Sequence, residues 1–121
     1  MPTVPAEEIL ELHAQVCAGL ADPKRIMILY ELLPGPRNVS DLAASLGMPQ
    51  PAVSRHLKVL RERGMVSSER QGASVRYSLA DQRIIQALDL LRAVLASKLQ
   101  SQAILVGAVQ SARVPSVGEE A

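Results

Sequence analysis

Several residue types are scarce in this chain of 121 residues, which has one cysteine, two tyrosines, and neither phenylalanine nor tryptophan. Because Cys17 is the only thiol, the chain cannot form an internal disulfide, which argues against a stapled extracellular scaffold and favours the cytoplasm. Aromatic residues make up only 2% of the sequence, so the core has to consist of Leu, Ile, Val, Ala and Met. That mixture favours helices.

Long apolar runs are absent as well. No stretch reaches the roughly 18 consecutive apolar residues that a membrane span needs, and no basic region precedes an apolar run at the N-terminus. We therefore expect neither a membrane partner nor a targeting signal. The length fits one domain of about 100–150 residues, and a hydrophobic content of 48% argues against a disordered chain.

The net charge of +1 conceals an uneven distribution along the chain. Residues 1–33 contain five acids and two bases, whereas residues 49–83 contain three acids and seven bases: Arg55, Lys58, Arg61, Arg63, Arg70, Arg76 and Arg83. A basic segment in a nearly neutral protein is typical of a phosphate-binding surface, although a solvated face gives the same pattern.

Helical spacing and breaking residues divide the chain into elements. The expected order is a helix from about residue 5 to Gly19, a helix from Asp22 to the prolines at 34–36, a short helix capped by Asn38 or Ser40 and ended by Gly47, a helix from 49–51 to Gly64, a β-hairpin over 65–79 around Gly72, and a helix over 81–113. In the first helix Ile9, Leu12, Val16 and Leu20 lie at helical spacing. The stripes expected to face inward are Ile26, Leu29, Leu32 and Leu33 on the second helix and Val53, Leu57 and Leu60 on the fourth.

This order predicts a winged helix-turn-helix, a mainly α fold with a small β-hairpin wing. At about 1.5 Å per residue the last helix would be roughly 48 Å long, so its far half needs another chain to cover its apolar side. We expect one winged-helix DNA-binding domain over residues 1–113 that forms a homodimer through its first and last helices, followed by a flexible tail over 114–121.

The second helix of such a motif enters the major groove of DNA. If Val53, Leu57 and Leu60 face inward, the opposite face presents Gln50, Ser54, Arg55 and Lys58. Gln pairs with adenine, Arg with guanine, and Ser with a base or a phosphate. His56 and Arg61 flank this face, where phosphate contacts are expected. Arg70 and Arg76 lie on the two arms of the hairpin. They either contact DNA as a wing or only keep the exposed hairpin soluble.

Three segments carry a family resemblance: LADPKRIMILYEL, VSDLAASLGMPQPAVSRHLKVLRERGMV and VRYSLAD. Over about residues 12–95 the chain resembles the ArsR/SmtB family of dimeric winged-helix transcriptional repressors. The resemblance implies a homodimer that binds a roughly palindromic double-stranded DNA operator and releases it when an effector binds. Two copies would present recognition helices to half-sites about one helical turn apart.

The chain departs from this family where the family senses its signals. Family members that sense arsenic or cadmium have cysteines at the start of the third helix, where this chain has Asn38, Val39 and Ser40. Zinc and nickel sensors place Asp and His, then His and Glu, on the last helix, where Asp81 and Arg83 occupy the first pair and no histidine follows. Dithiol sensors need two cysteines. We therefore expect no cofactor and leave the effector unidentified.

His13 and Cys17 remain as candidate ligands. They are four residues apart, share a helix face, and in a symmetric dimer two such pairs would form a four-ligand N/S site or a Cys17–Cys17 cross-link. An unpaired cysteine is more often buried, and a helix histidine is more often a plain surface residue.

Other function classes fit the sequence less well. An enzyme is not expected, because the chain has no Ser/His/Asp set, no paired acids in an apolar setting and no glycine-rich phosphate loop. A winged helix used only for protein assembly would show apolar residues where this chain has Gln50 and Arg55. A small hydrophobic ligand between the first and last helices stays open, although helix dimers have apolar interfaces in any case.

Overall fold

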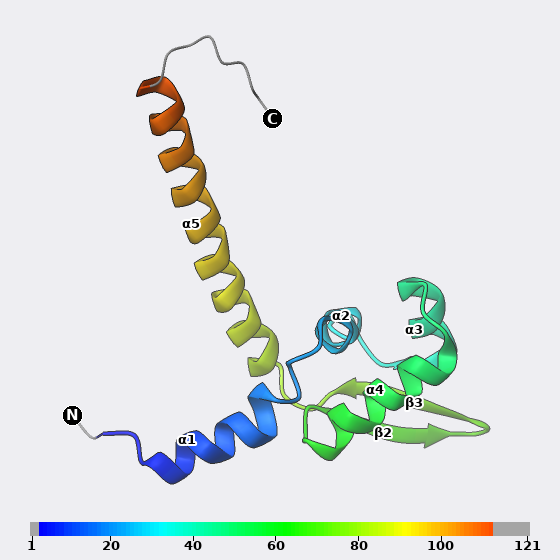
Figure 1. The fold of residues 1–121 in the computed structure, drawn as a ribbon. Helices are drawn as coiled ribbons and strands as arrows, with labels where there is room; N and C mark the ends of the chain where they lie inside the picture. Colours follow the sequence, from blue (N-terminus) through cyan, green and yellow to red (C-terminus); the bar gives the residue numbers. More distant parts are fainter. Residues whose placement is uncertain (1–2, 113–121) are drawn as a thin grey trace. The chain divides into compact units, whose positions relative to one another are not determined.

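A computed structural model describes residues 3–112. The chain divides into two compact units, one up to Ile85 and the other from Gln86 onward. The tail predicted over 114–121 lies outside the described residues. The first unit contains the elements of the expected helix-turn-helix and hairpin, in the expected order (Figure 1).

The predicted first helix consists of two kinds of turn. It begins as α1 (Ala6–Leu12) and continues as the π-helical segment η1 (His13–Cys17). In η1 the amide of Ala18 donates to the carbonyl of His13, five residues earlier, at 2.9 Å. Neither glycine nor proline marks this change in the sequence, so the helix was predicted and its π-helical turn was not.

The next helices begin and end where the capping residues predict. Helix α2 (Pro23–Glu31) starts at Asp22, whose side chain accepts a hydrogen bond from the Lys24 amide at 2.8 Å. Helix α3 (Val39–Leu46) is capped by Asn38 rather than by Ser40, and Gly47 ends it in the left-handed conformation with φ 63°. Helix α4 (Gln50–Glu62) follows after a tight turn and has its proline in the first turn.

The cap of α3 gives a first testable prediction. The Asn38 side-chain oxygen accepts from the Asp41 amide at 2.8 Å, which satisfies one of the free donors at the helix start. Asn38→Ala should therefore lower the free energy of unfolding by about 1 kcal/mol, and Asn38→Asp should preserve it. Urea denaturation of the three proteins measures both, and equal midpoints for Asn38→Ala and the unmutated chain would contradict the cap.

The wing belongs to a three-stranded antiparallel sheet with the order β1-β3-β2. Strands β2 (Val66–Gln71) and β3 (Ser74–Leu79) form the predicted hairpin, and Gly72 supplies the positive φ of 63° that its two-residue turn requires. Strand β1 (Arg37–Asn38) was not predicted, because two residues after a Pro-Gly-Pro segment show no periodicity. It pairs with β3 through Arg37 opposite Tyr77.

The core of the first unit is aliphatic, as the composition predicts. Its buried side chains are Ile28, Leu29, Leu32, Leu42, Ala43, Val53, Leu57, Leu60, Met65, Val66 and Ile85. The predicted stripe of α2 needs correction. On α2 Leu29 is buried as predicted, and Ile28 is buried where Ile26 was expected. Beyond the end of the helix, Leu32 is buried as predicted and Leu33 is exposed. On α1 both Ile9 and Leu12 are exposed, so that stripe is not part of the chain's own core.

The second unit begins within helix α5 (Arg83–Ala112), which has 30 residues and no proline. Its large exposed apolar side chains are Leu90, Leu91, Val94, Leu95, Leu99, Ile104 and Leu105. At about 1.5 Å per residue the helix is roughly 45 Å long, close to the predicted length. Among the helices of the described residues, none is both long enough and apolar enough to cross a membrane.

Candidate nucleic-acid interface

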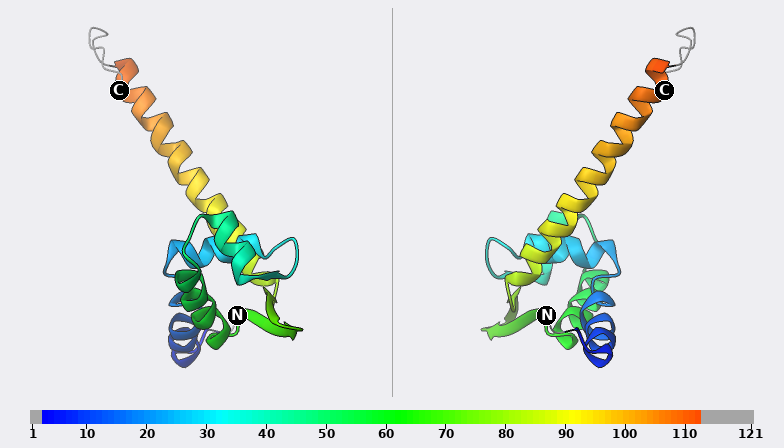
Figure 2. Two further views of the ribbon diagram at one scale, coloured as in Figure 1. Left: turned by 90° about the vertical axis from the view of Figure 1, so that its right-hand side faces the viewer. Right: turned by 90° about the vertical axis from the view of Figure 1, so that its left-hand side faces the viewer.

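Helix α4 has a buried apolar face and an exposed polar face, as predicted. Val53, Leu57 and Leu60 are completely buried and fix the helix to the core. The exposed residues that the sequence assigned to the opposite face are Gln50, Ser54, Arg55 and Lys58. The hairpin of β2 and β3 projects beyond the helices of this unit (Figure 1, Figure 2). A helix face and a projecting hairpin of one unit are thus both open to solvent.

Some of the basic residues of the segment 49–83 are held by the chain itself. Arg76 donates from Nη2 to the carbonyl of Pro36 at 2.8 Å, which ties the middle of the sheet to the loop before β1. Arg83 donates to Asp81 at 2.6 Å, and its hydrogen bonds lower the pKa of the Asp81 carboxyl to about 2. These two arginines have structural partners and are less available to an external ligand.

Other basic residues have no such partner. Arg55, Lys58 and Arg70 are exposed and make no hydrogen bond or ion pair with any part of the chain that the structure describes. Arg61 is exposed and donates to the Ser68 hydroxyl at 3.3 Å, a contact that leaves its charge unpaired. These four residues, on α4 and on β2, are called here the free cations.

Gln50, at the start of α4, contacts the preceding helix. Its Nε2 donates to the hydroxyl of Ser40 at 3.3 Å. The side-chain carbonyl and the second amide hydrogen of Gln50 remain available, and these two groups are what a glutamine needs to pair with adenine. The Ser40 hydroxyl thus contacts the start of α4.

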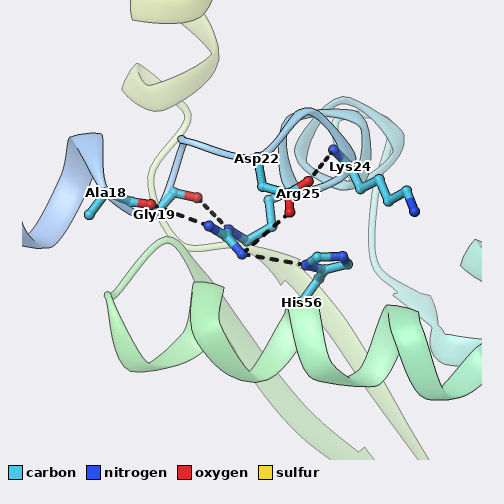
Figure 3. Close-up of polar contacts among 6 residues, drawn as sticks. All are labelled: Ala18, Gly19, Asp22, Lys24, Arg25 and His56. Carbon is cyan, nitrogen blue, oxygen red and sulfur yellow. Dashed lines mark hydrogen bonds and ion pairs between the residues drawn. The ribbon is translucent and has the colours of Figure 1, made fainter.

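His56 is half-buried and faces α2 (Figure 3). Arg25 donates from Nε to the Gly19 carbonyl at 2.7 Å and from Nη2 to the Ala18 carbonyl at 3.3 Å, and its Nη1 lies 3.5 Å from His56 Nδ1 and 3.9 Å from Asp22 Oδ2. Since a guanidinium only donates, His56 accepts through an unprotonated Nδ1. This position differs from the solvent-facing flank that the sequence suggested.

The surroundings of His56 disfavour its charged form. Burial lowers the pKa of His56 below its ordinary 6.5, and the positive charges of Arg25, Lys24 and Arg55 lower it further, against an opposing effect of Asp22. An ionic contact with a phosphate would need a protonated imidazole, which these surroundings disfavour. We therefore leave His56 out of the DNA contacts proposed below.

The lowered pKa of His56 predicts how stability depends on pH. The unfolded chain binds a proton at this histidine more readily than the folded chain does, so the contribution to stability is complete above about pH 6.5 and is lost as pH falls below it. Urea midpoints at pH 7.5 and 5.5 should differ for the unmutated chain and differ less for His56→Gln. The exposed His13→Gln is the matched control and should keep the full difference. An equal difference in His56→Gln and the control would contradict the assignment.

The two arginines assigned to the wing have different surroundings. Arg70 is exposed on β2, opposite Val75 and next to the last pair before the turn. Arg76 lies farther from the turn, opposite Glu69 on one side and Asn38 on the other. Only Arg70 is therefore near the tip of the hairpin with an unpaired charge.

The candidate ligands on the first helix are both exposed. His13 and Cys17 open and close η1, and the exposure of Cys17 corrects the expectation that this thiol is buried. Among the described residues, no group of three or more His, Cys, Asp or Glu side chains is placed to hold a metal ion.

Sequence reasoning missed two residues that anchor α4. Arg25 joins α2 to η1 and α4, and Arg63, after the last turn of α4, donates to the carbonyls of Ala14 and Gln15. Both were counted only as charges. Their partners are main-chain carbonyls from distant segments, which side-chain patterns do not reveal.

Comparison with known proteins agrees with this geometry. The family model "Bacterial regulatory protein, arsR family" matches residues 22–68, from the cap of α2 into β2. The transcriptional regulator NmtR of Mycobacterium tuberculosis is 45% identical over 91 residues, which are 73% of this chain and 74% of NmtR. The transcriptional repressor SmtB of the same species is 42% identical over 69% of this chain and 62% of SmtB.

A solved structure gives the same fold. The homodimeric winged helix-turn-helix DNA-binding domain of Mb0332 from Mycobacterium bovis superposes with a TM-score of 0.69 at 27% identity, over 84% of this chain and 95% of that domain. The predicted fold class is confirmed, and the relatives are transcriptional regulators rather than enzymes. The chain is therefore a winged helix-turn-helix DNA-binding transcriptional regulator and a member of the arsR family of bacterial regulatory proteins.

Proposed function

We propose that the chain is a homodimeric repressor that binds a roughly palindromic operator. In this proposal the outward face of α4 enters the major groove of each half-site, with Gln50, Ser54 and Arg55 toward the bases and Lys58 and Arg61 toward phosphates. Arg70 at the hairpin contacts the neighbouring groove or its phosphates. Such a protein works in the cytoplasm, where bacterial DNA lies.

The distribution of free cations is the observation that carries this proposal. Arg55, Lys58, Arg61 and Arg70 are exposed on two elements of one unit without acidic partners, whereas Arg76 and Arg83 of the same segment are held by the chain. A face that only solubilises the protein has no need for this separation. A face that replaces the counterions of DNA does need unpaired cations.

Exposed apolar side chains support the homodimer. On α1, Leu10 is 70% exposed and Ile9 is 48% exposed, and on α5 Leu91 and Leu95 are 61% and 53% exposed. Each of these two helices exposes large apolar side chains, and extended apolar patches are rare on monomeric soluble proteins. The homodimeric neighbour Mb0332 supports the second copy of this chain as the partner.

The positions of the family's usual sensors support a repressor without those sites. Asn38 is engaged as the cap of α3, Ser40 contacts Gln50, and Asp81 is paired with Arg83. A metal bound at the start of α3 or near Asp81 would have to displace these contacts. A dithiol sensor would need two cysteines, and the chain has one. The effector that releases the operator is thus of another kind, or the protein is controlled by its own concentration.

Binding to DNA from upstream of the protein's own coding region tests the proposal. Four free cations per chain, and eight per dimer, predict a slope of log affinity against log salt of up to about −7. The affinity for that DNA should exceed the affinity for a scrambled duplex of the same length by about 1,000-fold or more. Equal affinities for both duplexes would contradict a sequence-specific regulator, and a slope near zero would contradict the proposed surface.

The exposed thiol of Cys17 supports one alternative, a repressor that responds to metal or oxidation through His13 and Cys17. The same assay with added metal or oxidant decides it. If operator affinity changes in the unmutated protein and not in Cys17→Ser, the pair is the sensor. If affinity is indifferent in both, the alternative is excluded.

A further inference from the structure

Helix α4 is tied at two points to the short segment that ends the first helix. Near its middle, His56 contacts Arg25, which donates to the carbonyls of Ala18 and Gly19 (Figure 3). After its last turn, Arg63 donates to two carbonyls of η1. All of these residues belong to the first unit of the chain. We call this set of contacts the η1–α4 clamp.

The clamp uses main-chain carbonyls near the end of the first helix. The last carbonyls of a helix lack partners within the helix and carry the negative end of its dipole, so cationic donors suit them. Here the carbonyls of Ala14, Gln15, Ala18 and Gly19 accept from two arginines. Arg25 joins this segment to α2, and Arg63 joins it to the end of α4. A change in the direction of η1 would therefore move α4 or break these hydrogen bonds.

Packing around Gly19 makes the same connection tight. Gly19 is buried, and a Cβ atom built on it would lie 2.1 Å from Met65 Cε and 2.8 Å from Arg63 Cδ. Met65 is itself 1% exposed and packs in the core directly after α4. The end of the first helix therefore lies against the side chains of Arg63 and Met65, which would have to move to accept a side chain at position 19.

We propose that Arg25 and Arg63 are positioning residues for DNA binding. They fix the recognition helix to the segment that follows the exposed apolar face of α1, so that the geometry of the dimer surface sets the separation of the two recognition helices. This inference rests on the proposed homodimeric, operator-binding function. It assigns to two arginines outside the free cations a share of operator recognition that needs no contact with DNA.

Operator affinity measured against non-specific affinity tests the clamp. Arg25→Gln and Arg63→Gln, each confirmed as folded by its circular dichroism spectrum, should lower operator affinity by roughly 3- to 30-fold. Their affinity for a scrambled duplex and their salt slope should stay the same, because no phosphate contact is removed. Arg25→Lys and Arg63→Lys keep a cationic donor and should recover part of the operator affinity. Arg92→Gln, on α5, is the matched control and should behave as the unmutated chain.

Three outcomes are distinguishable in this assay. Equal losses for operator and scrambled DNA, with a shallower salt slope, would mean that the arginines contact phosphate directly and would overturn the clamp. Unchanged operator affinity in folded Arg25→Gln and Arg63→Gln would overturn it as well. An unmutated protein that binds no DNA specifically would instead overturn the proposed function.

A distance measurement tests the same inference without DNA. In a Cys17→Ser background, Glu62→Cys places one spin label per chain at the exposed end of α4. Pulsed electron paramagnetic resonance should give a narrow distribution of distances between the two labels of a dimer. In Arg25→Gln or Arg63→Gln this distribution should be broader or shifted. An unchanged distribution in both variants would overturn the clamp. The absence of any label pair within range would instead contradict the homodimer.

Discussion

Arg55→Ala is expected to cause one of the two largest losses of operator affinity. A bidentate contact between an arginine and a guanine contributes about 1–3 kcal/mol of discrimination, and a dimer has two copies of the contact. The loss should therefore be about 2–6 kcal/mol, which corresponds to roughly 30-fold to 20,000-fold in affinity. Because Arg55 has no partner in the described chain, the free energy of unfolding should not change.

Lys58→Ala separates base recognition from phosphate contact on the same helix face. A lysine that neutralises a phosphate contributes equally for all sequences, so its loss should weaken operator and scrambled DNA together and make the salt slope shallower by about 1 per contact. Arg55→Ala should instead act mainly on the operator and relax the preference for one base pair. Fluorescence anisotropy titrations with operator variants at three salt concentrations distinguish the two patterns.

Arg92→Ala is the matched control for these variants. Arg92 is 69% exposed on α5, and its ion pair with Asp89 at 3.1 Å is a surface contact between neighbouring turns. Its removal takes away the same charge without touching α4. Operator affinities of Arg55→Ala and Lys58→Ala that equal that of Arg92→Ala would contradict the placement of α4 in the major groove.

The extent of α4 and of its inward face followed from local chemistry. Prolines at 49 and 51 fit only the first turn of a helix, Gly64 stops it, and three apolar residues at i, i+4 and i+7 fix the buried side. All three proved completely buried. The candidate DNA-reading residues could be assigned from sequence because they occupy the other side of a helix with known ends.

The use of each arginine could not be assigned in this way. Sequence gives the charge of Arg55 and of Arg63 alike, yet Arg63 is engaged with carbonyls 48 and 49 residues away and Arg55 has no internal partner. Main-chain carbonyls of η1 become acceptors only after the chain has folded. The same holds for β1, because it pairs with a strand that is distant in sequence: Arg37 lies opposite Tyr77, 40 residues later.

The apolar face of the first helix was predicted from the helical spacing of its residues, and the sequence assigned this helix to a homodimer interface rather than to the core of one chain. Ile9 and Leu12 are each 48% exposed in the single chain. The helical spacing of apolar residues predicts that one face of a helix is covered, but it does not predict whether the same chain or a second molecule covers it. This exposure and that of α5 have one physical explanation in the proposed homodimer, in which both faces are covered by a second copy.

Leu91→Glu combined with Leu95→Glu is the second change with a large expected effect. Both leucines are exposed on α5, 61% and 53%, and lie 40° apart around a helix of 3.6 residues per turn. In a dimer they would be buried, and burying two unpaired carboxylates per chain costs several kcal/mol. Light scattering should therefore give the mass of one chain, 13.0 kDa, where the unmutated protein gives twice that value.

The loss of the dimer should also remove most of the operator affinity. Two linked recognition helices bind two half-sites with an avidity that exceeds the affinity of one by about 100- to 10,000-fold. The monomeric variant retains α4 and its free cations, so its affinity for a single half-site should be unchanged.

Ala93→Glu combined with Gln100→Glu adds the same charges on the opposite side of α5 and is the matched control. A double variant at 91 and 95 that stays dimeric would assign the interface to another surface, whereas a monomer with full operator affinity would show that one recognition helix suffices and that the operator is not palindromic.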